Sequence, residues 1–320
     1  MKNFKLILTI LIFYFHILIA ASSDPVFGEN GMIVSTSKQA SEAGIEILKK
    51  GGNAVDAAVA VGFALAVTSS SNGNIGGGGF MVAAMTDGET FTLDYREKAP
   101  AAAHRDLFLN DSGNVVPGMS LFSRAGSGVP GTVDGLIRAL ADHGSGNITL
   151  RQALAPAIRL AEKGFELSHY EARRFNGYEG LFQSNDAAAA IFIRKNNNPW
   201  KKGDKLVQRD LAKTLKRISK YGRDGFYTGP IADLIVAEMK RGNGLISLED
   251  LKNYLSVYRD HVSGTYNGHE VISMGPPSSG GALLVNMMNM LENYPVDSLG
   301  WNSSDYIHLL TEVERRAYAD

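Results

Sequence analysis

The sequence contains no cysteine among its 320 residues. Disulfide bonds, thiolate nucleophiles and thiolate metal sites are therefore excluded from this chain. An excess of charge is also lacking, because 32 lysines and arginines are balanced by 33 aspartates and glutamates, for a formal net charge of −1. This balance gives no electrostatic reason to expect a nucleic-acid partner or an acidic partner.

Several catalytic motifs are absent as well. The histidines show no H-E-x-x-H or other close metal-ligand spacing, so we expect no metal site. No serine lies in a G-x-S-x-G elbow, and Ser278 and Ser279 lie in a Pro/Gly-rich turn without an identifiable base. Four glycines at 76–79 are followed by Phe80 and Met81, whereas a phosphate-binding P-loop needs Lys and then Ser or Thr. The residues alone therefore predict no catalytic group and no cofactor.

The amino-terminal residues have the pattern of a secretory signal peptide. Residues 1–5 carry two lysines, residues 6–19 are almost wholly apolar, and residues 20–23 are small, as a cleavage site requires. A retained membrane anchor is the alternative, but the apolar stretch is shorter than the ~20 residues that a spanning helix needs. We predict a signal peptide at residues 1–21 and a mature chain that is secreted across a membrane, to the periplasm or the cell exterior.

The remaining residues have an ordinary globular composition, with 44% hydrophobic and 20% charged residues, and are numerous enough for a large core. Asn53 is placed to cap one helix, and Thr149 with Gln152 forms a capping box for another. Periodicity and punctuation predict strands near 31–36, 80–85, 90–95 and 270–274, and helices near 41–50, 54–67, 133–141, 150–163, 211–221, 231–239, 248–254, 282–291 and 304–320.

The four glycines at 76–79 mark the most distinctive stretch of the chain. They remove every Cβ from a short passage, so the backbone can approach another segment closely. The two strand patterns that follow are separated by Asp87-Gly88, which is a two-residue hairpin signal. We therefore expect a crossing of two backbones followed by a hairpin.

Arg96 follows the second strand of this predicted hairpin. A guanidinium group keeps its charge and offers two parallel N–H donors, a geometry suited to binding a carboxylate. The alternative is a surface ion pair with Asp94 or Glu97, which would contribute little to stability. The residues alone leave these two interpretations open.

Eight short motifs occur in order along the chain. They lie at residues 41–60 (S-E-A-G-I-E-I-L-K-K-G-G-N-A-V-D-A-A-V-A), 76–80 (G-G-G-G-F), 94–100 (D-Y-R-E-K-A-P), 128–133 (G-V-P-G-T-V), 225–232 (G-F-Y-T-G-P-I-A), 246–254 (I-S-L-E-D-L-K-N-Y), 275–281 (G-P-P-S-S-G-G) and 317–320 (A-Y-A-D). Together they resemble the large-subunit region of the γ-glutamyltransferases, a family that includes the glutathione hydrolases.

The resemblance implies an α+β fold, the αββα sandwich of the N-terminal nucleophile hydrolases, and a precursor that cuts itself into a large and a small subunit. It also implies that the first threonine of the small subunit attacks the γ-glutamyl amide of glutathione or a related donor, with no cofactor. The glutamyl group then passes to water, an amino acid or a dipeptide. The arginine of the family's R-E-x-A-P motif, which is Arg96 here, is expected to hold the α-carboxylate of the donor.

The chain departs from the family pattern in one respect. The threonine-initiated segment with its T-T-H-type start does not occur in the sequence. We therefore expect residues 22–320 to be the large-subunit-like part of one domain, truncated at its carboxyl end, so that the sandwich is incomplete. We expect no catalytic residue in this chain and no activity from it alone. The alternatives are a non-catalytic secreted remnant, a peptide-binding protein on the same scaffold, or a related acylase.

Overall fold

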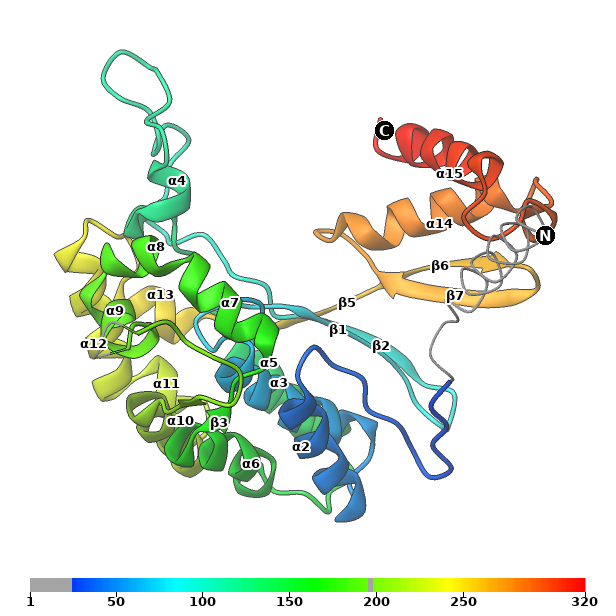
Figure 1. Cartoon of the computed structure of the whole chain (residues 1–320). Coiled ribbons are helices and arrows are strands. Elements are labelled where there is room, and N and C mark those ends of the chain that lie inside the picture. Colours follow the sequence, from blue (N-terminus) through cyan, green and yellow to red (C-terminus); the bar gives the residue numbers. More distant parts are fainter. Residues whose placement is uncertain (1–24, 195–197, 320) are drawn as a thin grey trace, which may run out of the picture. The chain divides into compact units, whose positions relative to one another are not determined.

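The computed structural model describes residues 25–194 and 198–319 (Figure 1). The chain divides into two units, Met1–Ile33 and Val34–Asp320. In the first unit, the described residues 25–33 form neither a helix nor a strand. The predicted signal peptide at residues 1–21 lies outside the described residues and stays a prediction. Everything that follows concerns the second unit.

Helices make up most of this unit. The α-helices are α2 (Lys38–Lys49), α3 (Ala54–Thr68), α4 (Met119–Phe122), α5 (Thr132–His143), α6 (Leu150–Lys163), α7 (His169–Gly177), α8 (Glu179–Gln183), α9 (Asp186–Phe192), α10 (Arg209–Tyr221), α11 (Asp224–Tyr227), α12 (Gly229–Arg241), α13 (Leu248–Asn253), α14 (Ser279–Leu291) and α15 (Ser304–Ala317), with short 3-10 turns at Arg124–Gly126 and Val296–Ser298. Among the described residues, no helix combines the length and the hydropathy that a membrane crossing requires.

The strands form three small antiparallel sheets. Strands β1 (Phe80–Ala84) and β2 (Thr90–Asp94) form the predicted hairpin, and β5 (Val257–Arg259) pairs with the other edge of β2 (Figure 1). The register of the hairpin places Phe80 opposite Asp94. The other two sheets pair β3 (Phe165–Glu166) with β4 (Lys205–Leu206), and β6 (His261–Tyr266) with β7 (His269–Met274).

Helix α3 is almost wholly apolar and is buried along most of its length. The Asn53 side chain accepts a hydrogen bond from the Asp56 N–H, and the Asp56 carboxylate accepts one from the Asn53 N–H, so the first turn has its donors satisfied. Helices α2, α5 and α6 pack against it. Because α3 is apolar on all sides, it lies at the centre of the hydrophobic core of this unit.

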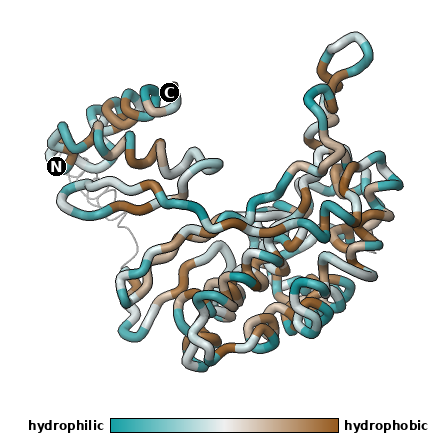
Figure 2. Tube along the Cα trace, turned by 180° about the vertical axis from the view of Figure 1, so that it is seen from behind, coloured by the Kyte–Doolittle hydropathy of each residue, from teal (hydrophilic) through white to brown (hydrophobic). Residues whose placement is uncertain are grey.

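The surrounding helices are amphipathic. Figure 2 shows hydrophobic and hydrophilic segments alternating along their traces, as expected for helices that bury one side. In α10, for example, Ala212, Leu215 and Ile218 are buried, at the helical spacing of three residues. The capping box of Thr149 and Gln152 begins α6, as predicted from sequence.

The strand predicted at residues 31–36 is wrong. The Ser35 hydroxyl donates to Ser37 O at 2.8 Å and accepts from the Ser37 N–H at 3.3 Å, so a local turn forms here directly before α2. Helix α2 then begins at Lys38, three residues earlier than expected, because Ser37 is its N-cap. The short helices α7 to α9 and the strands β5 and β6 were not predicted.

Candidate functional site

The backbone of Arg96 is held at both of its polar groups. The Arg96 N–H donates to Asp94 Oδ1 at 2.9 Å, which closes a tight turn directly after β2. The Tyr254 hydroxyl, from the residue after α13, donates to Arg96 O at 2.8 Å. The position from which the Arg96 side chain extends is therefore fixed from two sides.

The two ion pairs considered for Arg96 do not form. The second oxygen of Asp94 accepts from Arg259 Nε on β5 at 2.7 Å, so this buried carboxylate is already used by another arginine. In the part of the chain that the structure describes, neither Glu97 nor any other acid forms an ion pair with Arg96, whose side chain is exposed. Its guanidinium donors are therefore available for a ligand.

The backbone of the glycine run packs directly against the Arg96 turn. Gly79 exchanges two backbone hydrogen bonds with Tyr95, at 3.2 and 3.0 Å, which continues the β1–β2 ladder. A Cβ at Gly78 would lie 2.5 Å from Tyr95 O, 2.7 Å from Glu97 N and 2.8 Å from Arg96 Cα. Only a residue without a side chain fits at this distance, so the predicted close crossing of two backbones is confirmed.

A second segment, residues 129–132, forms backbone hydrogen bonds next to the Arg96 turn. Lys98 and Val129 exchange backbone hydrogen bonds at 3.1 and 2.7 Å. Gly77 O accepts from the N–H groups of Gly131 and Thr132, at 2.8 and 3.0 Å, where α5 begins. The turn that carries Arg96 is thus held between the glycine run and the start of α5.

A buried ion pair extends this support to α13. Asp134, in the first turn of α5, accepts from Arg223 Nε at 2.8 Å and from the Ser256 N–H at 2.7 Å. Arg223 also donates to the carbonyl of Tyr254. Sequence reasoning missed these supporting residues. The available signal was that Tyr254 ends one of the quoted motifs.

Burial keeps the tyrosines around Arg96 in their neutral form. It raises the pKa of Tyr95 to about 12, and it raises the pKa of Tyr254 well above its ordinary value, with the Asp134 carboxylate adding to the effect. A neutral phenol can donate a hydrogen bond, whereas a phenolate cannot. The bond from Tyr254 to Arg96 O therefore persists throughout the neutral pH range.

The site so described can bind an anion, and it contains no assembled catalytic group. Among residues 25–194 and 198–319, no three His, Asp or Glu side chains are grouped to hold a metal ion. The Ser278 hydroxyl accepts from the Gly280 N–H at 3.2 Å and caps α14, which is a structural role. Arg96 thus offers an exposed guanidinium, extending from a backbone that is held in place, to one carboxylate.

Comparison with known proteins gives a consistent result. The family model for gamma-glutamyltranspeptidase matches residues 40–320. The glutathione hydrolase proenzyme of Pseudomonas sp. (strain A14) is 46% identical over 302 residues, and the acylase ACY 1 proenzyme of Pseudomonas sp. (strain SE83) is 36% identical over 308 residues. The crystal structure of Helicobacter pylori gamma-glutamyltranspeptidase superposes on this chain with a TM-score of 0.89 at 43% identity. The superposition covers 92% of this chain and 84% of the Helicobacter pylori chain.

The chain spans about half the length of the curated relatives that it matches. The alignment with the Pseudomonas sp. (strain A14) protein covers 94% of this chain and 52% of that protein, and the corresponding values for the acylase are 92% and 54%. The structural match and the mixture of helices with antiparallel sheets confirm the predicted α+β class.

Proposed function

The chain belongs to the γ-glutamyltranspeptidase family, and we propose that it forms the donor-binding part of a γ-glutamyltransferase or glutathione hydrolase. In this proposal, Arg96 binds the α-carboxylate of the γ-glutamyl donor, and glutathione is the first donor to consider. The chain contributes binding and orientation to the reaction.

One observation carries this proposal. Arg96 has an exposed guanidinium without an acidic partner in the described structure, on a backbone that Asp94 and Tyr254 hold in place. Because the backbone of this turn is already ordered, binding has to order only the side chain of Arg96, and the guanidinium is delivered from a defined position. Holding the donor by one end also fixes where its γ-amide lies for attack.

The attacking group is proposed to come from sequence beyond that of this chain. By resemblance to the family, it is the hydroxyl of a threonine that begins a small subunit, activated by its own amine, which titrates near neutral pH. The hydroxyl oxygen would bond to the γ-carbonyl carbon, and the amide C–N bond would break. The amide nitrogen would leave as an amine, with the proton taken from the hydroxyl. Water, an amino acid or a dipeptide would then take the glutamyl group from the resulting ester.

Three further points belong to the proposal. We propose that this chain is inactive alone, because the threonine-initiated segment expected from the family does not occur in its sequence. We propose that its partner is the small subunit of the same precursor, in keeping with the name proenzyme carried by its relatives. We also propose that it acts outside the cytoplasmic membrane, because residues 1–21 have the pattern of a signal peptide.

The proposal can be tested with a fusion enzyme, in which this chain is joined to the remaining half of the Pseudomonas sp. (strain A14) relative. We expect the fusion enzyme to release the anilide from a γ-glutamyl anilide. Arg96→Gln should raise the KM for this donor by roughly 10- to 150-fold, because a hydrogen bond to a charged group contributes about 1.5–3 kcal/mol.

The matched control is Arg105→Gln, which removes the same charge from a side chain that is 95% exposed and pairs loosely with Asp106 at 3.6 Å. This variant should keep the donor KM of the parent fusion. Equal KM values for Arg96→Gln and the parent would overturn the role proposed for Arg96. A well-folded but inactive parent fusion would favour the non-catalytic alternative.

The second candidate function is that of an acylase, because an acylase is 36% identical to this chain. In that function the acyl group of the donor would not be an amino acid. An acylase would accept a glutaryl anilide, which lacks the α-amino group of glutamate, as well as the γ-glutamyl anilide. We expect the fusion enzyme to prefer the γ-glutamyl donor, because the glutathione hydrolase relative is more similar to this chain than the acylase, at 46% against 36% identity. Arg96 would pair with the terminal carboxylate of either donor, so it does not distinguish the two. A preference for the glutaryl donor would move the assignment to the acylases.

A further inference from the structure

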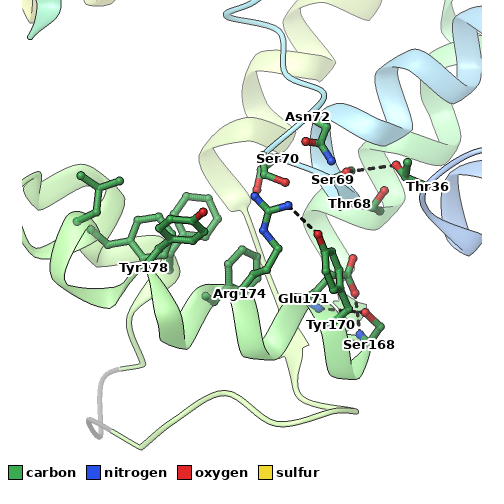
Figure 3. Close-up of a pocket in the computed structure, with 15 residues that line it drawn as sticks. Thr36, Thr68, Ser69, Ser70, Asn72, Ser168, Tyr170, Glu171, Arg174 and Tyr178 are labelled. Carbon is green, nitrogen blue, oxygen red and sulfur yellow. Dashed lines mark hydrogen bonds between the residues drawn. The ribbon is translucent and has the colours of Figure 1, made fainter. Parts of the chain in front are cut away.

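A pocket lies beside helix α7, and Arg96 does not line it. It has a volume of about 390 Å³, which is within the range of small-molecule sites. Its walls come from the turn after α3, from α7 and from the short helices α8 and α9 (Figure 3). These segments are distant in the sequence, so the pocket is a product of the fold.

Among the described residues, Arg174 is the one basic side chain that lines this pocket. Figure 3 shows it extending from α7 between Tyr170 and Tyr178, toward the turn that contains Ser70. It donates to the Tyr170 hydroxyl at 3.0 Å, and the two tyrosine rings lie 5.6 and 5.7 Å from its guanidinium carbon. The rings restrict the side chain, which prepares it to bind a ligand.

No acid neutralises Arg174 in the part of the chain that the structure describes. Glu171 also lines the pocket, but its carboxylate accepts from the Ser168 N–H at 2.7 Å and completes the capping box of α7. Arg174 therefore retains N–H donors that can meet an anion. Since Glu171 adds a negative charge to the wall, a singly charged anion fits better than a doubly charged one.

The rest of the pocket has a polar side and an apolar side. Ser69 O accepts backbone bonds from Asn72 and Gly73 at 2.9 and 2.8 Å, so the turn is closed within itself. The Ser69 hydroxyl accepts from the Thr36 hydroxyl at 3.4 Å, whereas the hydroxyls of Ser70 and Ser71 have no partner in the described structure and remain for a ligand. On the other side, the rings of Phe175, Phe182 and Phe192 pack on one another with centroids 5.0–6.3 Å apart. Such a surface suits an aromatic or branched apolar group.

We propose that this pocket binds a small carboxylate that carries an aromatic or other apolar group. Arg174 pairs with the carboxylate, the serine-rich turn adds hydrogen bonds, and the phenylalanine cluster covers the apolar group. This site is distinct from the donor site proposed at Arg96, and the assignment does not depend on that function.

The probe is N-acetyl-L-phenylalanine, titrated into the purified protein expressed from the full chain and followed by calorimetry or ligand-observed NMR. We expect saturable binding, with a sub-millimolar Kd that is typical of ligands of this size. Arg174→Gln should weaken binding at least tenfold. Arg174→Lys, which keeps the charge but loses the two-pronged geometry, should weaken it about threefold or more.

Two variants and two ligands serve as controls. Arg173→Gln removes the same charge from an exposed neighbour on α7, and Arg96→Gln removes it from the proposed donor site, so both should bind the probe as the parent does. N-acetyl-L-phenylalaninamide and inorganic phosphate should both bind at least tenfold more weakly than the probe.

The proposal is overturned if the parent shows no saturable binding, or if Arg174→Gln and Arg174→Lys both bind as well as the parent. Equal binding of the amide would show that the carboxylate is not recognised. Equal or tighter binding of phosphate would show a general anion site. Thermal unfolding of each variant separates a lost contact from a lost fold.

Discussion

Replacing Gly78 with alanine tests whether the glycine crossing positions Arg96. The added Cβ would lie 2.5 Å from Tyr95 O, 2.7 Å from Glu97 N and 2.8 Å from Arg96 Cα, whereas ordinary contact begins at 3.4 Å. All three atoms belong to the backbone of the Arg96 turn, so this turn must move by roughly half an ångström or more. Overpacking of this kind typically costs about 1–3 kcal/mol of unfolding free energy.

Gly76→Ala is the matched control within the same glycine run. Its Cβ would meet only Asn74 Oδ1, at 3.4 Å, and neither glycine has a left-handed backbone conformation. Each change from glycine to alanine lowers the conformational entropy of the unfolded chain, which stabilises the folded state by about 0.4–1 kcal/mol. This contribution is common to both variants and cancels when they are compared. Gly78→Ala should therefore be less stable than Gly76→Ala by about 1–3 kcal/mol.

Two assays report on this pair of variants. Denaturant unfolding of the full chain, followed by circular dichroism, compares their stabilities. The donor KM in the fusion enzyme compares the placement of Arg96, and it should rise in Gly78→Ala and stay near the parent value in Gly76→Ala. Equal stability together with equal KM would refute the inference that the crossing sets the position of Arg96.

Three further predictions concern the same region. Asp94→Ala should lower the unfolding free energy by about 1 kcal/mol more than Asp94→Asn. Both variants lose the charge that pairs with Arg259, but asparagine keeps an oxygen acceptor for the Arg96 N–H. Equal losses of unfolding free energy in denaturant would contradict this. Burial raises the pKa of Tyr95 from 10.0 to about 12, so its contribution to stability is complete below pH 10 and is lost as the pH rises to about 12. Between pH 10 and about pH 12, the unfolding free energy of Tyr95→Phe should fall less than that of the parent. Identical falls would show that ionisation of Tyr95 does not destabilise the protein in this range. Finally, the purified chain alone should release no anilide from a γ-glutamyl anilide, and any enzymatic turnover would refute its proposed inactivity.

The sequence predicted the features whose determinants lie close together in the chain. The cap of α3 by Asn53 and the capping box of Thr149 with Gln152 each involve residues three apart, and both form as predicted. The hairpin is equally local, although its register makes the loop three residues long, 86–88, and not the two predicted, with Gly88 at positive φ. Local hydrogen bonds of this kind are set by residue type and spacing, so they can be read without knowledge of the fold.

The sequence could not decide what surrounds Arg96, because the deciding partners are far away in the chain. Arg259, which occupies Asp94, is 165 residues from it, and Tyr254 is 158 residues from Arg96. Without these contacts, a local pair between Asp94 and Arg96 was an equally good interpretation. The structure removes that alternative, while the role of Arg96 in donor binding stays a prediction.

The pocket at α7 was missed for a different reason. Its helices are short, and each buries few residues, so their apolar periodicity is weak. The sequence did contain one signal, the capping box of Ser168 with Glu171 that begins α7. The packing of Phe175, Phe182 and Phe192 into one cluster depends on how three helices meet, which no single segment encodes.

The most direct test of the account is a double-mutant cycle between Arg96 and the donor. Parent and Arg96→Gln fusion enzymes are compared on a γ-glutamyl anilide and on a 4-aminobutyryl anilide, which lacks the α-carboxylate. If Arg96 binds that carboxylate, its substitution should reduce kcat/KM strongly for the first donor and little for the second, with a coupling energy of about 1.5–3 kcal/mol. Equal reductions for the two donors would show that Arg96 does not bind the α-carboxylate.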